Sequence, residues 1–271
     1  MRRLDGPVQF RVRGFAPRDN ATAAAITLIG IVALWQAAAS AGWITSLFLP
    51  PPVAIGRAIW QLAATGELWK HLSASLLRLA IGWSIGTAFG VAMGIAIGLF
   101  TLTRSPLMAI VAALFPIPKI ALLPLLILWF GIGEVPAVFT AFLISFFPIV
   151  VNVATGLATI EPELEDVLKA LGASKLDIMR KVGIPRTLPY FFGSLKIAIT
   201  LAFVGSVISE SIASNYGIGN LMLQAQAQFQ VPLIFAGLVA LAIEGIVMYW
   251  LMAMLETRMT GWAQRSGFAQ N

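Results

Sequence analysis

The sequence has 271 residues, of which 59% are apolar and only 11% are charged; an average soluble domain carries about 25% charged residues, so a fold with a fully water-facing surface is excluded. With no cysteine and one histidine, His71, the chain cannot form a disulfide, a thiolate metal site or a histidine metal cluster. Its net charge is +6, but the basic residues lie between apolar runs, so we interpret them as membrane-topology signals and not as a nucleic-acid-binding face.

Long apolar runs are the main structural signal. No charged residue occurs between Asp19 and Arg57, and about 20 apolar residues cross a bilayer. Helices satisfy their own backbone hydrogen bonds there, and the period-two alternation of barrel strands is missing. We therefore predict an all-α, polytopic membrane protein with about six transmembrane helices, at residues 22–42, 74–100, 106–131, 135–158, 188–209 and 233–254.

The N-terminal part predicts a basic cytoplasmic tail, 1–21, followed by the first transmembrane helix, 22–42. A basic lead and an apolar run also mark a signal peptide, but this run exceeds the roughly 7–15 residues of a signal core, and further spans follow. We expect an uncleaved helix.

Lysine and arginine residues predict the orientation. If the N-terminus is cytoplasmic, thirteen of them lie in inside segments, including the C-terminal tail 255–271, and only Arg57 and Lys70 lie outside. This asymmetry follows the positive-inside rule and puts both termini in the cytoplasm.

The external loop, 43–73, is too long for a simple turn. It opens with the stiff break Leu49-Pro50-Pro51-Pro52. The segment Val53–Ala64 then predicts an amphipathic helix at the membrane interface.

The second span carries five glycines, each four residues apart, which would form one face without side chains. Another helix can approach such a face closely. The partner helix could belong to a second subunit or to the same chain. These helix-packing residues are Gly82, Gly86, Gly90, Gly94 and Gly98.

The third span contains three prolines, Pro116, Pro118 and Pro124, which disrupt helical hydrogen bonds. Broken helices at membrane depth occur where they are buried or line a cavity, and they often build transport sites. The prolines either line a pathway or form a kink that only shapes the packing.

Ionisable residues within the spans are candidates for function, because a central charge costs about 2.5–3.5 kcal/mol to insert. Lys196 can extend toward the inner face, whereas Lys119 and Glu244 fall near mid-membrane. We hypothesise that these two interact; a protonated Glu244 satisfied by a neighbouring helix is an equal alternative. The full set is Arg78, Lys119, Lys196, Glu210 and Glu244.

The inside segment 159–187 has five acidic and five basic residues and predicts a helical hairpin for a soluble partner. We expect a first helix, a turn at Gly172–Ser174, a second helix and a stop at Pro185. Ser174 can cap the second helix, with Asp177 completing a variant capping box.

This segment resembles the EAA loop of ABC importer permeases, in which E-A-A is followed by three residues, Gly, nine residues, Ile, one residue and Leu-Pro. The spacing after the glycine is kept, whereas Asp166-Val167-Leu168 replaces E-A-A. The resemblance implies these ATPase-coupling residues: Asp166, Ala170, Leu171, Gly172, Ser174, Val182, Ile184 and Pro185.

Further motifs resemble the nitrate/sulfonate/taurine permease family over about residues 49–262. They are Ser75-Leu76-Leu77-Arg78 with Gly82, the run from Ala121 through Pro124 and Gly131 to Glu134, Phe146-Phe147-Pro148, Gly193 to Ala198, Ser209-Glu210, and Tyr216-Gly217 to Leu221.

The resemblance implies a type I ABC importer transmembrane domain, with its core at 74–254, in a bacterial inner membrane. The implied partners are cytoplasmic ATPase subunits, an external substrate-binding protein and a second permease subunit, expected to be a second copy. Without a phosphate-binding GxxxxGK[ST] loop, the chain should be no enzyme and hold no cofactor, ATP and Mg²⁺ being bound by the partner. The expected solute is small and anionic, like a sulfonate, nitrate or taurine.

Two other classes compete with this interpretation. An ion-gradient-driven secondary transporter would explain Lys119 and Glu244 but not the 159–187 hairpin, and the chain shows no internal repeat of the kind such transporters have. The second class, a membrane-embedded enzyme, is disfavoured because the sequence has no carboxylate pair within a predicted span.

Overall fold

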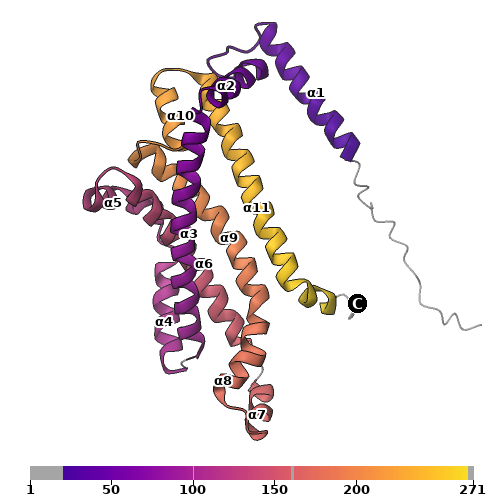
Figure 1. The fold of residues 1–271 in the computed structure, drawn as a ribbon, viewed down its shortest axis with the longest axis vertical. Helices are drawn as coiled ribbons and strands as arrows, with labels where there is room; N and C mark the ends of the chain where they lie inside the picture. Colours follow the sequence, from indigo (N-terminus) through magenta and orange to yellow (C-terminus); the bar gives the residue numbers. More distant parts are fainter. Residues whose placement is uncertain (1–20, 100, 160–161, 268–271) are drawn as a thin grey trace, which may run out of the picture. The chain divides into compact units, whose positions relative to one another are not determined.

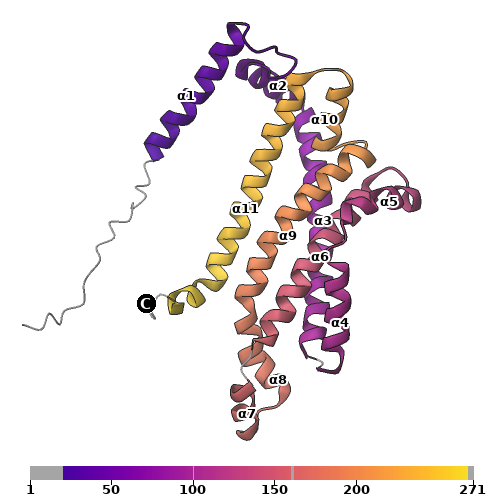
Figure 2. The same cartoon turned by 180° about the vertical axis from the view of Figure 1, so that it is seen from behind.

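The computed structural model describes residues 21–99, 101–159 and 162–267, and all regular structure in these ranges is helical. Figures 1 and 2 show the helices from two opposite sides. The chain divides into two units, Met1–Val53 and Ala54–Asn271, which are described separately.

The first unit contains helix α1 (Ala21–Ser40). Its segment Thr22–Ser40 is long and apolar enough to cross a membrane, and none of it is buried by the protein. Exposed apolar side chains such as Ile26 and Leu34 therefore suit contact with lipid. The side chain of Gln36, in the last turns of this helix, accepts a hydrogen bond from the Val53 amide (3.1 Å), which closes the loop that follows the helix.

The second unit is built on four long helices. These are α3 (Glu67–Leu99), α6 (Glu134–Ala158), α9 (Ile184–Ala213) and α11 (Val231–Gly267). Helix α6 contributes the largest share of buried residues, because α3 and α9 both pack against it. Apolar side chains such as Ile149, Val153 and Phe192 form the main core cluster.

The glycine stripe of α3 packs on α6 of the same chain. A Cβ atom added to Gly82 would lie 2.4 Å from the Val138 carbonyl oxygen, and one added to Gly86 would lie 2.0 Å from Ser145 Oγ. Contacts move down both helices together, from Gly82 at Val138 to Gly98 at Leu157, so the two helices run parallel. Of the two interpretations, packing within the subunit holds for this face.

The third span is broken, as the prolines predict, and is not one helix over 106–131. Helix α4 (Thr101–Leu114) is followed by the short helix η1 (Lys119–Leu122) and by α5 (Leu123–Phe130). The two halves meet at 79°. Because Pro118 has no N–H, it cannot donate to the Leu114 carbonyl four residues earlier, so the helix ends there.

Two short helices pack on α11 at one end of this unit. Helix α2 (Pro52–Ala64) confirms the predicted helix at Val53–Ala64. Its residues Ala58 and Leu62 bury against Leu221 of α10 (Ile218–Ala227) and Ala236 of α11. Helix α10 was not predicted, because its 10 residues are too short to register as a span.

The 159–187 segment forms helix α7 (Pro162–Ala170), a turn and helix α8 (Lys175–Ile178). The predicted stop at Pro185 is wrong. A π-helical turn, η2 (Met179–Gly183), leads from α8 directly into α9, so one helical run extends from Leu176 to Ala213. Pro185, which lacks an N–H, lies just after the π turn, where the regular helical hydrogen bonding is already interrupted.

Within the described residues, five helices are long and apolar enough to span a membrane, and there are six if the bent pair α4–α5 counts as one span. Several ends differ from the prediction: α3 begins at Glu67, and α11 continues to Gly267, through most of the predicted tail 255–271. Apolarity marks where a helix enters the bilayer, not where its hydrogen bonding ends.

Replacing Gly86 by leucine should destabilise the α3–α6 pair. Its added atoms would meet Ser145 and the Phe142 backbone, and overpacking of this kind costs about 1–3 kcal/mol. The midpoint of thermal unfolding of the purified protein should fall. The control is Gly56→Ala on α2, whose Cβ meets nothing within 4 Å; an equal loss from both variants would contradict the close-packing assignment.

Candidate functional site

The first candidate site is the α7–α8 hairpin, whose turn is built by Gly172. This residue has φ +87°, a left-handed conformation that glycine adopts without steric penalty. Its amide donates to the Lys169 carbonyl (2.9 Å), and the Ala173 amide donates to that of Leu168 (2.9 Å). The predicted turn is confirmed, and it reverses the chain within four residues.

Ser174 and Asp177 form the predicted reciprocal cap on the second helix. The Asp177 amide donates to Ser174 Oγ (3.2 Å), and the Ser174 amide donates to Asp177 Oδ2 (3.2 Å). Hydrogen bonds from the Ser174 hydroxyl and amide lower the pKa of the Asp177 carboxyl. The cap therefore favours the ionised form of Asp177.

The predicted coupling residues divide into two groups. Asp166, Ala170, Leu171, Gly172 and Ser174 are exposed on the hairpin, whereas Val182, Ile184 and Pro185 lie where η2 joins α9. Large apolar side chains also stand out from the hairpin, with Leu171 78% exposed and Leu176 71% exposed. Such side chains on a polar hairpin suit contact with a partner.

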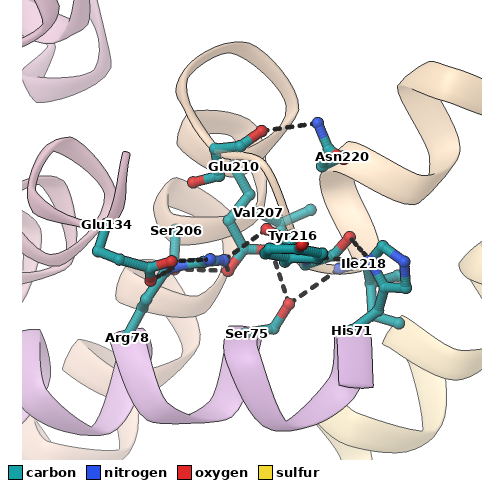
Figure 3. A network of polar contacts seen from close by, with 12 residues as sticks. His71, Ser75, Arg78, Glu134, Ser206, Val207, Glu210, Tyr216, Ile218 and Asn220 are labelled. Atoms are coloured by element: carbon teal, nitrogen blue, oxygen red, sulfur yellow. Dashed lines mark hydrogen bonds and ion pairs between the residues drawn. The ribbon is translucent and has the colours of Figure 1, made fainter. Parts of the chain in front are cut away.

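The opposite end of the bundle holds a polar network that the sequence did not predict as one site (Figure 3). His71, Ser75 and Arg78 lie on one face of α3, at helical spacing. Arg78 Nη2 donates to Glu134 Oε1 (2.7 Å) at the start of α6, and Arg78 Nε also binds this carboxylate. Arg78 Nη1 donates to the Tyr216 carbonyl (2.6 Å).

Glu210 of α9 completes this network from within the protein. It is fully buried, and its Oε1 lies 3.5 Å from Arg78 Nη1. The Ser75 hydroxyl donates to Glu210 Oε2 (2.7 Å) and accepts a hydrogen bond from the Ile218 amide (3.0 Å). Charge pairing and hydrogen bonds together stabilise a carboxylate in this setting.

Gly217 allows the α9–α10 connection to approach the ion pair. A Cβ atom there would lie 2.4 Å from Glu210 Oε2 and 2.8 Å from Arg78 Nη1, and the residue has φ +120°. His71 Nδ1 lies 2.9 Å from the Gly217 carbonyl oxygen. The network thus joins α3, α6, α9 and α10, and four of the motifs quoted from the sequence meet in it.

The remaining ionisable residues lie apart from one another. The Lys119 ammonium donates to the carbonyls of Leu114 (3.1 Å) and Phe115, not to Glu244. Glu244 is 5% exposed, and neither carboxyl oxygen has a hydrogen-bond partner. The hypothesis of a Lys119–Glu244 pair is wrong, because the lysine donates to carbonyls at the proline break instead. Lys196 pairs with Glu256 of α11 (2.7 Å).

The predicted pathway residues Pro116, Pro118 and Lys119 gather at the break between α4 and η1, and Pro124 lies in the first turn of α5. Glu210 and Glu244 lie instead in the packed interior. Within the ranges that the structure describes, no three His, Asp or Glu side chains come together as a metal site.

The long apolar helices, with the polar hairpin at one end and the buried ion pair at the other, are typical of a polytopic membrane transport domain. Residues 72–261 match the family described as "Binding-protein-dependent transport system inner membrane component". The chain therefore belongs to this family of ABC importer permeases.

Similar proteins support this assignment. The chain is 38% identical to the "Putative aliphatic sulfonates transport permease protein SsuC" of Escherichia coli (strain K12), covering 80% of this chain and 82% of the relative. It is 36% identical to the "Riboflavin transport system permease protein RibX" of Chloroflexus aurantiacus, covering 88% of both. It is 30% identical to the "Taurine transport system permease protein TauC" of E. coli, covering 87% and 88%.

Among solved structures, the fold is similar to an inward-facing MetNI methionine ABC transporter chain, with a TM-score of 0.61 and 20% identity over 73% of this chain and 96% of that chain. The predicted fold class, a type I ABC importer transmembrane domain, is confirmed.

Replacing Arg78 by methionine should leave Glu210 buried without a countercharge, a change that typically costs about 3–5 kcal/mol. Glu134→Gln should cost less, about 1 kcal/mol at most, because the Glu134 side chain is 61% exposed. Unfolding free energies of the purified variants measure both. The double variant Arg78→Met/Glu210→Gln should be more stable than the sum of the single effects predicts; additive effects would contradict the pairing.

The capping pair gives a prediction for pH. Because the pKa of Asp177 is lowered in the folded hairpin, its stabilisation is present above the ordinary carboxyl pKa, near 4, and is lost as pH falls through the lowered value. The measurement is amide hydrogen exchange in residues 174–178 of the wild type and of Asp177→Asn. As the pH falls into the acid range, exchange in the wild type should become faster relative to the variant, and at neutral pH this change should be absent. Ser174→Ala should weaken the helix by about 0.5–2 kcal/mol at neutral pH. A wild-type hairpin with the pH dependence of Asp177→Asn would contradict this.

Proposed function

We propose that this chain is the permease subunit of an ATP-driven importer and forms the translocation pathway for a small anionic solute. The family to which the chain belongs, together with its fold, supports its assignment as a permease subunit. Relatives named for sulfonates and taurine, at 38% and 30% identity, support an anionic solute of that kind.

The coupling element in this proposal is the α7–α8 hairpin. The observation that carries it is the glycine turn with exposed Leu171 beside it, joined without interruption through η2 to α9. A separate cytoplasmic ATPase, which binds ATP and Mg²⁺, docks on this hairpin, and its motion moves α9. Hydrolysis is the work of that partner and not of this chain.

The remaining partners follow from the same proposal. An external binding protein delivers the solute, and a second permease subunit, a second copy of this chain, completes the pathway. The charge asymmetry supports cytoplasmic termini and a cytoplasmic hairpin. Cysteine labelling of intact cells tests this orientation: a residue placed at Ala54 should react from outside, and labelling at position 171 would contradict it.

Gly172→Val should abolish most transport while the protein still inserts. A branched side chain at φ +87° strains the turn by about 1–3 kcal/mol. No atom lies within 4 Å of the added Cβ, so the damage acts through the backbone and misplaces Asp166, Ala170 and Leu171. Solute uptake and copurification of the ATPase subunits measure the effect.

Gly172→Asn is the matched control, because asparagine adopts positive φ more readily than valine. It should retain more uptake and more ATPase than Gly172→Val. Wild-type uptake and ATPase association in Gly172→Val would overturn the coupling role of the hairpin.

A further inference from the structure

Lys119 lies at mid-depth of the bundle. Its ammonium is 4.3 Å from the centre of the Phe147 ring, and Phe147 is near the middle of the 25-residue helix α6. At 1.5 Å per residue, that ring is about 20 Å from the Glu134 end of α6. The lysine is therefore far from both ends of a membrane-spanning helix.

The charge of Lys119 has no carboxylate partner in the part of the chain that the structure describes. Arg78 binds Glu134 and Glu210, and Lys196 binds Glu256. Lys119 instead donates to the carbonyls of Leu114 and Phe115. An ammonium has three N–H donors, so these two bonds leave one donor and the net positive charge available.

A cavity of about 230 Å³ opens beside this charge at the proline break. Its lining includes Phe115, Ile117, Pro118, Lys119, Phe147 and Pro148. A lysine at this depth is costly when it faces lipid and occurs where it faces protein or a water-filled space. A cavity that faces another protein surface or water therefore suits this charge better than one that faces lipid.

We propose that Lys119 is an anion-contact site midway along the translocation pathway. Its remaining ammonium donor binds the oxyanion head of a small organic anion, such as an alkyl sulfonate, while Phe115, Pro118 and Phe147 contact the short carbon stem. This inference rests on the proposed import function and names the residue that meets the solute. Arg78 cannot take this part, because it is 1% exposed and already bound to Glu134, Glu210 and the Tyr216 carbonyl.

A purely structural role is the competing explanation. Pro118 leaves the Leu114 carbonyl without its helical donor, and Lys119 supplies one. That role alone requires no anion, so anion dependence separates the two explanations.

The first test measures protection in the wild-type complex of permease, ATPase and binding protein in lipid nanodiscs. Reductive methylation of lysines is quantified by peptide mass spectrometry, with ethanesulfonate or the uncharged ethyl methyl sulfone added. Ethanesulfonate should reduce methylation of Lys119 and the sulfone should not, while Lys70, exposed outside the cavity, should be unaffected by either. Unchanged methylation of Lys119 at the highest ethanesulfonate concentration would overturn the proposal. Because no variant is used, misfolding cannot obscure the result.

The second test measures ethanesulfonate uptake by the same complex in proteoliposomes. Lys119→Gln should reduce uptake about tenfold or more, the usual effect of losing a hydrogen bond from a charged group. Lys119→Arg, which keeps the charge, should restore much of it, and Arg258→Gln, which removes an exposed cation on α11, should match the wild type. Wild-type uptake in Lys119→Gln would overturn the anion-contact site and leave the import function intact. Protection of Lys119 without any wild-type uptake would support the contact site and contradict the proposed solute class.

Discussion

The parallel packing of α3 on α6 is the contact on which the rest of the second unit depends. Gly82 faces the carbonyl of Val138, Gly86 that of Phe142 and Gly90 that of Phe146, so each glycine meets the residue at the same offset along α6. One step earlier on the same repeat, Arg78 meets Glu134. The register that lets two backbones approach also pairs the guanidinium with the carboxylate. A slip of one residue would rotate the contact face by about 100° and separate them.

Local features could be predicted from the sequence because each depends on a few neighbouring residues. A left-handed turn requires a residue such as Gly172, a serine three residues before an aspartate caps a helix at Ser174 and Asp177, and Pro118 removes a hydrogen bond wherever it stands. The glycine stripe predicted a close helix contact, although its partner could not be identified from spacing alone. All of these signals have a period or a pattern of their own.

The polar network around Arg78 and Glu210 could not be predicted from the sequence, because its contacts join residues up to 146 positions apart. Arg78 and Glu210 are evident in the sequence as ionisable residues within spans and Glu134 as the end of a motif, but their meeting depends on the α3–α6 register and on Gly217. The mistaken pairing of Lys119 with Glu244 arose from matching depths alone, since depth does not tell which helices are neighbours. The signal that could have found the right partners is charge balance: Arg78 is a buried cation, and a buried cation requires acidic partners.

Helix α9 connects the two ends of the bundle. It starts at Ile184 beside the hairpin and carries Glu210 one turn before its last residue, Ala213. The π turn η2 lies directly before α9, and Pro189 lies near its start; π turns and prolines are positions at which helices bend. A force applied to the hairpin, as the proposed coupling requires, therefore meets two bending positions at the hairpin end before it reaches the rest of α9. At its far end, α9 is bound to Ser75 and Arg78 of α3 through Glu210. Movement of α9 must then either carry α3 with it or break the buried ion pair, and the cost of stranding Glu210 favours the first.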